Sequence, residues 1–205
     1  MNHIFCLTGK SASGKDTIYQ RLLKDHELGL KRIVPYTTRP MREGEQNGRE
    51  YYFESVQQFE EARQKGRIIE AREYATYYGP WHYYTKDDGQ IDLEKASFLV
   101  PSTLESYSNM RSFFDGRDEE GIPTVLPVYI DLDDGIRLQR ALNRELEGDH
   151  PRYEEMCRRF LSDQIDFSDE KIREAGITRR FINDDLDRCT REIREYILGI
   201  LHPCE

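Results

Sequence analysis

Short runs of apolar residues alternate along the chain with longer stretches in which apolar positions recur at helical spacing. We expect strands over Ile4–Leu7, Phe98–Val100, Thr124–Ile130 and Arg180–Ile182, with a further strand near Lys31–Pro35. We expect helices over Lys15–Asp25, Leu104–Phe114, Asp134–Leu146, Tyr153–Asp166 and Asp185–Leu201. This alternation predicts an α/β fold with a parallel sheet between layers of helices.

The stretch from about residue 35 to residue 85 has a different pattern. Tyrosine-rich, strand-like pieces at Tyr51–Phe53 and Arg67–Tyr74 flank a helix over Ser55–Lys65, which Gly66 ends. We therefore expect a small lobe inserted into a single domain, whose core comprises about 1–34, 86–139 and 160–205.

Two polar segments break the pattern further along. The stretch Gly148–Pro151 separates two charged helices, so residues of about 140–159 are expected to form a helical lid. The stretch Asp115–Gly121 is expected to be a polar surface loop.

Charge and cysteine usage narrow the function classes. The 205 residues include 30 basic and 39 acidic side chains, and the net charge of −9 disfavours broad binding to nucleic acid or to anionic membranes. The four cysteines show no metal-ligand spacing, which is typical of reduced thiols in a cytoplasmic protein. We see no secretory signal and no apolar stretch of the roughly 18 residues that would span a membrane.

Residues 9–17, GKSASGKDT, lie between the first expected strand and the first expected helix. This is the context of a phosphate-binding loop, in which glycines let backbone amides approach phosphates at a helix N-terminus and a lysine reaches the β- and γ-phosphates. The candidate ATP-binding residues are Gly9, Ser11, Ala12, Ser13, Gly14, Lys15, Asp16 and Thr17. Asp16 stands where the motif usually has Ser or Thr, so a carboxylate is the candidate ligand for Mg²⁺.

A second motif follows in the inserted lobe. It runs TTRPMREGEQNGREYYF from Thr37 to Phe53 and continues as IIEAREYATYYG from Ile68 to Gly79. With these residues the chain resembles guanylate kinases over nearly its whole length. The resemblance implies a P-loop NTPase three-layer core, an inserted nucleotide-binding lobe and a helical lid.

The resemblance also implies roles for individual residues of the lobe. Arg39, Arg42, Tyr51 and Tyr78 match residues that hold the phosphate of the acceptor nucleotide, and Glu70 matches the carboxylate that accepts the N–H groups of guanine. These roles suit the chemistry of the side chains. Two guanidinium groups can form paired, charge-assisted hydrogen bonds to one phosphate, and a carboxylate can accept from paired N–H donors. The alternative for the arginines is a solvated basic loop, and the alternative for Glu70 is a surface charge after a strand.

The lid and the last strand supply the remaining candidates. Arg140 and Arg144 share a helix face, and the resemblance implies that they close over the polyphosphate together with Arg158 or Arg159. Asn183 ends a strand and is a candidate contact for the donor adenine.

Several positions depart from the family pattern. Pro35 and Pro80 stand where guanylate kinases commonly have hydroxyl side chains, and Val100 and Ser102 stand where they have acidic ones. The family uses these positions to grip guanine or to organise Mg²⁺. Asp87 or Asp88 could join Asp16 in replacing the lost acidity.

These observations predict phosphorylation of a nucleoside monophosphate by ATP and Mg²⁺, with GMP as the expected acceptor. Two alternatives stay open: a kinase for another nucleotide or a sugar phosphate, and a non-catalytic guanylate-kinase-like binding module. The sequence leaves the oligomeric state undetermined.

Overall fold

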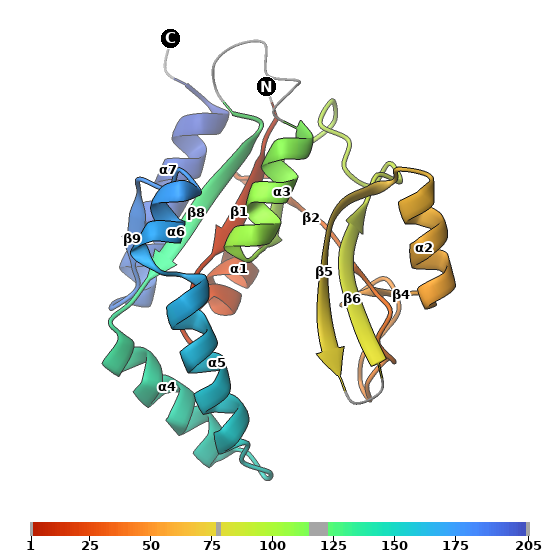
Figure 1. The fold of residues 1–205 in the computed structure, drawn as a ribbon. Helices are drawn as coiled ribbons and strands as arrows, with labels where there is room; N and C mark the ends of the chain where they lie inside the picture. The colour runs from red at the N-terminus through yellow and green to blue at the C-terminus, as the bar shows by residue number, and fades with distance from the viewer. Residues whose placement is uncertain (1, 77–78, 115–122, 204–205) are drawn as a thin grey trace.

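A parallel sheet forms the centre of the molecule (Figure 1). The computed structural model describes residues 2–76, 79–114 and 123–203. The five strands of this sheet lie in the order β2-β7-β1-β8-β9. Their bounds are β1 Ile4–Thr8, β2 Lys31–Arg32, β7 Phe98–Pro101, β8 Val125–Asp131 and β9 Arg180–Ile182. The predicted strands are confirmed, and the parallel α/β architecture with them.

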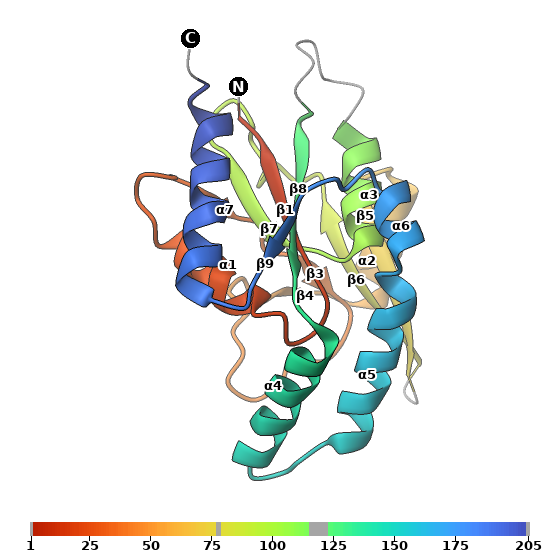
Figure 2. The ribbon, with the colours of Figure 1, turned by 90° about the vertical axis from the view of Figure 1, so that its left-hand side faces the viewer.

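Helices cover both faces of the sheet, as Figure 2 shows. Helices α1 (Lys15–Leu23) and α7 (Leu186–Leu201) lie on one face, and α3 (Leu104–Phe114) and α6 (Asp169–Glu174) lie on the other. Successive residues of a strand point to opposite faces, so Phe5 and Leu7 of β1 pack with the first pair of helices, while Ile4 and Cys6 pack with the second.

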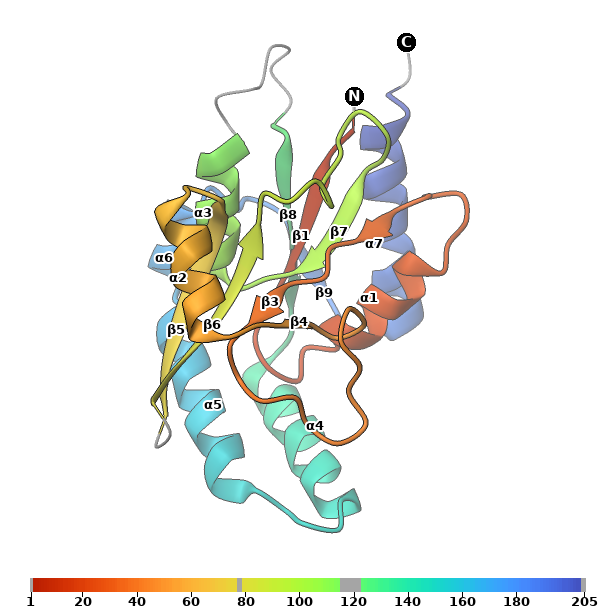
Figure 3. The same ribbon diagram turned by 90° about the vertical axis from the view of Figure 1, so that its right-hand side faces the viewer.

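A second, mixed sheet forms a lobe beside the core. Its strands lie in the order β4-β3-β6-β5, with bounds β3 Tyr36–Thr37, β4 Tyr52–Phe53, β5 Ile68–Thr76 and β6 Gly79–Lys86. Figure 3 shows the chain passing from β2 of the core into β3 of the lobe. Helix α2 (Val56–Gln64) covers this sheet over a small cluster of Tyr36, Phe59 and Tyr84. The strand-like pieces and the helix predicted here are confirmed.

The lid is a pair of helices, α4 (Asp134–Glu147) and α5 (Tyr153–Asp166). The predicted break at Gly148–Pro151 separates them, and they project away from the core and the lobe (Figure 1). The predicted polar loop at Asp115–Gly121 and the candidate Tyr78 lie outside the described residues.

Two predictions from composition can be compared with the structure. Cys6, Cys157 and Cys189 are free thiols. Within the three described ranges, no helix has the length and apolar character needed to cross a membrane.

Candidate active site

The loop between β1 and α1 follows a path that only glycine can adopt at two positions. Gly9 has φ 153° and Gly14 has φ 89°. A Cβ atom on Gly9 would lie 2.5 Å from the carbonyl oxygen of Ile130, and one on Gly14 would lie 2.1 Å from Nδ2 of Asn183. A side chain at either glycine would therefore clash with Ile130 of β8 or with Asn183, which directly follows β9. The loop packs closely against the ends of these two strands because both positions are glycine.

Lys15 begins α1 and turns back across the loop. Its Nζ donates to the carbonyl oxygen of Gly9 at 3.3 Å. Burial lowers the pKa of Lys15, although the nearby carboxylates of Asp16 and Asp163 oppose that shift. The ammonium group is thus held inside the loop, where a bound phosphate would lie.

Arginines of the lid meet this loop around a cavity of about 240 Å³. The cavity is lined by residues 10–17 together with Arg140, Arg144 and Arg159. Arg158 pairs instead with Glu155 at 2.6 Å on the lid surface. The structure therefore places Arg159, rather than Arg158, with the two arginines that the sequence singled out.

Both lid helices also bind the backbone of the loop, a feature that the sequence did not reveal. Asp163 of α5 accepts from the amide of Ser11 at 2.8 Å, and Arg137 of α4 donates to the carbonyl of Ser11 at 2.8 Å. Arg137 also contacts Asp163 at 3.3 Å and Asp134 at 2.6 Å, and its side chain is only 1% exposed. The backbone of Ser11 is thus bound through both its amide and its carbonyl, which belong to two successive peptide units.

Asn183 supports the loop from β9. Its side chain is buried, and Nδ2 donates to the carbonyl oxygen of Ser13 at 2.6 Å. The carbonyl of Asn183 in turn accepts from Arg140 at 3.1 Å. Asn183 therefore links the loop to the lid, and its contact with the donor adenine stays a prediction.

In the lobe, Arg39 is oriented by a carboxylate of the same motif. Its guanidinium makes two hydrogen bonds to Glu45, at 2.7 and 2.5 Å, and lies 5.1 Å from the centre of the Tyr51 ring. Because of the hydrogen bonds from Arg39, the pKa of Glu45 falls to about 2. Glu45 also accepts from the backbone amide of Arg42, whose side chain is exposed. Arg39, Tyr51 and the turn carrying Arg42 thus form one unit.

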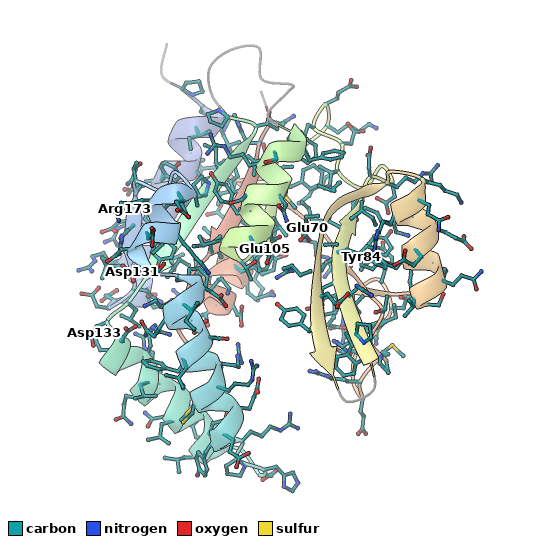
Figure 4. The ribbon with its side chains drawn as sticks, viewed as in Figure 1. Glu70, Tyr84, Glu105, Asp131, Asp133 and Arg173 are labelled. Carbon is teal, nitrogen blue, oxygen red and sulfur yellow. The ribbon has the colours of Figure 1, made fainter. Side chains whose placement is uncertain are left out.

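Glu70 lies on the face of β5 that points to the core. Figure 4 shows it between the lobe and α3, whereas Tyr84 points to the side of α2. Its side chain is buried, and Oε1 accepts from Thr85 at 2.9 Å. Oε2 lies 3.6 Å from Nε of Arg72. Ser102 at the end of β7 is buried as well. Thr85 and Arg72 were not among the predicted site residues.

The predicted ligand for a divalent cation, Asp16, lies beside the loop. Asp16 is exposed and lines the loop cavity. No cluster of three or more His, Cys, Asp or Glu that could hold a metal occurs in the part of the chain that the structure describes. This fits Mg²⁺, which usually takes one or two carboxylates and completes its shell with phosphates and water. Asp88 instead accepts from the hydroxyl of Tyr36 in the lobe.

Comparisons with known proteins agree with this arrangement. A sequence model of the family described as "Guanylate kinase" matches residues 1–85, which contain the loop and most of the lobe. A guanylate kinase of Listeria monocytogenes (serotype 4b, strain F2365) is 42% identical over 143 residues, covering 60% of this chain and 68% of that protein. A guanylate kinase of Neisseria gonorrhoeae is 42% identical over 98 residues, covering 48% of this chain and 45% of that protein.

The fold has its counterpart among solved structures. The crystal structure of guanylate kinase from Anaplasma phagocytophilum superposes with a TM-score of 0.64 at 19% identity, covering 98% of this chain and 87% of that one. At that identity the likeness concerns the fold, while the Listeria relative establishes descent. This chain belongs to the guanylate kinase family.

Proposed function

We propose that this protein transfers the γ-phosphoryl group of ATP to GMP, giving ADP and GDP. The observation that supports this most directly is the presence of two groups of cationic side chains suited to phosphates, one at the loop and one in the lobe. Lys15 and three lid arginines surround one cavity, and Arg39 with Tyr51 forms the other site in the lobe. Ligands of open α/β sheets usually bind at the carboxyl ends of the strands, where the loop after β1 lies.

The chemistry needs no nucleophile from the protein. A phosphate oxygen of GMP would attack the γ-phosphorus of ATP, and the bond from that phosphorus to the β-bridging oxygen would break. Lys15, the loop amides and the lid arginines would stabilise the negative charge on the transferred group. Mg²⁺, when bound, would neutralise the polyphosphate, and Asp16 is the side chain that would hold it.

The residues of this chain would also position the two nucleotides. Arg39 would bind the acceptor phosphate from a guanidinium already held by Glu45, so little side-chain entropy is lost on binding. Glu70 would accept from the ring N–H of the base, because its Oε2 is buried and has no hydrogen-bond partner in the described part of the chain. Positioning of this kind accounts for a large part of the rate of phosphoryl transfer.

A panel of acceptors tests the proposal. ADP formation is measured with ATP, Mg²⁺ and each of GMP, dGMP, AMP, CMP, UMP and ribose 5-phosphate, with Lys15→Met as the control for background. We expect GMP to be the preferred acceptor and Lys15→Met to lose about 10²- to 10³-fold in rate, as enzymes do when one group stabilising the transition-state charge is removed.

One result would contradict GMP as the acceptor, and another would contradict the kinase activity itself. A faster reaction with another acceptor would refute GMP as substrate while leaving the kinase activity in place. No ADP formation above the Lys15→Met background with any acceptor, in protein whose circular dichroism shows a folded chain, would favour the non-catalytic binding module.

A further inference from the structure

Two polar atoms in the lobe are buried side by side without hydrogen-bond partners. Glu70 and Arg72 are two residues apart on β5, so both side chains point to the core side of the lobe, while Ala71 between them packs against the aromatic cluster of Tyr36 and Tyr84. Oε2 of Glu70 and Nε of Arg72 are each buried and have no hydrogen-bond partner in the described part of the chain, although the two atoms form a long ion pair with each other.

The two atoms do not satisfy each other. They lie 3.6 Å apart, which is too long for a hydrogen bond. The side chain of Glu70 is 2% exposed and that of Arg72 is 19% exposed. Arg72 lines a cavity of about 540 Å³ together with Thr103 and Leu104 at the start of α3. The donor, Arg72, therefore lines a space that a ligand can enter, and the acceptor, Glu70, lies directly beside Arg72.

Buried polar atoms without partners are rare in folded proteins because each loses its hydration without compensation. A ligand that presents a donor beside an acceptor would satisfy both atoms. The Watson–Crick edge of a 6-oxopurine does so, since its N1–H is next to O6. Adenine has the opposite arrangement, with an unprotonated N1 beside an N6 amino group.

The geometry points to Arg72 as a second specificity-determining residue of the acceptor site, which donates to O6 of guanine while Glu70 accepts from N1–H. This inference rests on the proposed function, because it assumes that the acceptor carries a purine base. The substrate class follows as 6-oxopurine nucleoside monophosphates, with IMP accepted as well as GMP.

Another role for Arg72 has to be distinguished from this one. After burial, which is the main cause, the positive charge of Arg72 contributes to lowering the pKa of Lys15, so Arg72 lies within electrostatic range of the phosphate loop. A guanidinium there could instead attract the acceptor phosphate. If Arg72 recognises the base, its substitution should change the ranking of the acceptors. If Arg72 attracts the phosphate, its substitution should lower kcat/KM for all acceptors by the same factor.

The test compares Arg72→Met, Arg72→Lys and the control Arg67→Met. Arg67 is exposed and directly precedes β5, so its variant removes a nearby charge outside the site. kcat/KM is measured for GMP, IMP and AMP, and binding of the three nucleotides is measured by calorimetry without ATP. Thermal unfolding checks that each variant is folded.

We expect Arg72→Met to reduce kcat/KM and affinity for GMP and IMP about 10- to 100-fold, the loss typical of a hydrogen bond to a charged group, with AMP nearly unchanged. Arg72→Lys, which keeps a donor and the charge, should recover part of the preference, and Arg67→Met should behave as wild type. Equal losses for all three nucleotides, or unchanged GMP values, would overturn the inference. If Arg72→Met does not fold, the same criteria apply to Arg72→Leu, which also removes the donor and the charge.

The calorimetric measurements separate this inference from the proposed function. Wild-type protein that binds GMP and IMP more tightly than AMP without transferring phosphate would refute the kinase activity, and loss of that preference in Arg72→Met would still support the role of Arg72. Transfer to GMP in wild type with the same ranking of acceptors in Arg72→Met would refute the role of Arg72 alone. A wild type that shows no preference for GMP and IMP over AMP would overturn the inference.

Discussion

Some residues of the two motifs are held in position by side chains that lie in the same motif or next to it. Arg39 is held by Glu45, six residues later in the same TTRPMREGE run. The low pKa of Glu45 means that this carboxylate is charged throughout the neutral range, so it keeps Arg39 in place before any nucleotide arrives. The guanidinium keeps further N–H donors for a phosphate, because it has five in all.

Asp16 has two competing roles, as a ligand of Mg²⁺ or as a charge that stabilises the start of helix α1. Its carboxylate lines the loop cavity in the first turn of α1, where it could hold Mg²⁺ or could only favour the helix dipole. We predict that Asp16→Ala raises the Mg²⁺ concentration needed for half-maximal activity and weakens binding of MgATP while affecting binding of metal-free ATP little. Asp16→Ser should restore much of both properties, because it recreates the usual motif.

Activity and calorimetric titrations of ATP with and without Mg²⁺ check this prediction. If Asp16 only stabilises the helix, both variants will lose at most about 1 kcal/mol of stability, typical of a charge at a helix terminus, and will keep the wild-type dependence on Mg²⁺.

How far the sequence predicts the site depends on whether a residue's partner is near in the chain. The loop and the run from Thr37 to Phe53 are continuous, so their residues could be named from the loop's spacing and from the family resemblance that the second run carries. Asp163 lies 152 positions from Ser11, and no pattern in either segment indicates that they meet. Arg72 could have been found, because the two-residue period of a strand places it on the same face as Glu70.

Among the elements, the lid helices have the clearest link to the site. Arg137 donates to the carbonyl of Ser11 and Asp163 accepts from its amide, and Lys10 donates to Asp134 and Gln164, each at 3.2 Å. Hydrogen bonds from Arg137 and its neighbours hold the pKa of Asp134 below its ordinary value in spite of burial, which acts to raise it. The position of the lid and the shape of the loop are therefore coupled.

We predict that Asp163→Asn weakens ATP binding more than GMP binding. The variant removes a charged acceptor from the Ser11 amide and from the buried Arg137, which should cost about 1–3 kcal/mol in stability and distort the loop. Glu154→Gln is the matched control, because Glu154 lies on the same helix α5 and is exposed. Calorimetry with each nucleotide and thermal unfolding supply the measurements; equal losses for ATP and GMP would show that α5 acts only on overall stability.

The elements that the sequence did not predict are the weakly patterned ones. Helix α6 spans only Asp169–Glu174 and buries Ile172 alone, so it has too few residues to show a helical period. Strand β6 begins with Gly79 and Pro80, which usually indicate a turn. Its pairing with β5 and β3 supplies the hydrogen bonds that stabilise it, and these contacts are tertiary.

At the scale of the whole molecule, the hydrophobic cores are distributed unequally. Two large clusters flank the parallel sheet, whereas the lobe has a small cluster of its own around Tyr36, Phe59 and Tyr84. The lid buries even less apolar surface. Helix α5 contains no fully buried side chain, and Leu161 and Ile165 are largely exposed. Segments with few buried apolar contacts open and move at low cost in free energy. The core should therefore be rigid, and the lobe and lid should be the parts that move.

Closure of these two parts is the prediction that concerns the whole molecule. The phosphates of ATP and of the acceptor must meet, yet the lobe and the lid project from the core as separate parts (Figure 1). A fully compact chain of this length has a radius of gyration of about 17 Å. We predict that small-angle X-ray scattering gives a larger value for the free protein, and that a non-hydrolysable ATP analogue with Mg²⁺ and GMP brings it toward that limit.

Each nucleotide alone should produce only part of this change, because in the proposed function ATP would contact the loop and lid while GMP would contact the lobe. Closure would exclude water from the transferred group and so protect ATP from hydrolysis. Arg39→Ala, which removes the buried guanidinium that we assign to the acceptor phosphate, should abolish the part of the change that depends on GMP and leave the part that depends on ATP. A radius of gyration that does not respond to the two nucleotides together, at concentrations that calorimetry shows to be saturating, would mean that the free protein already has its working shape.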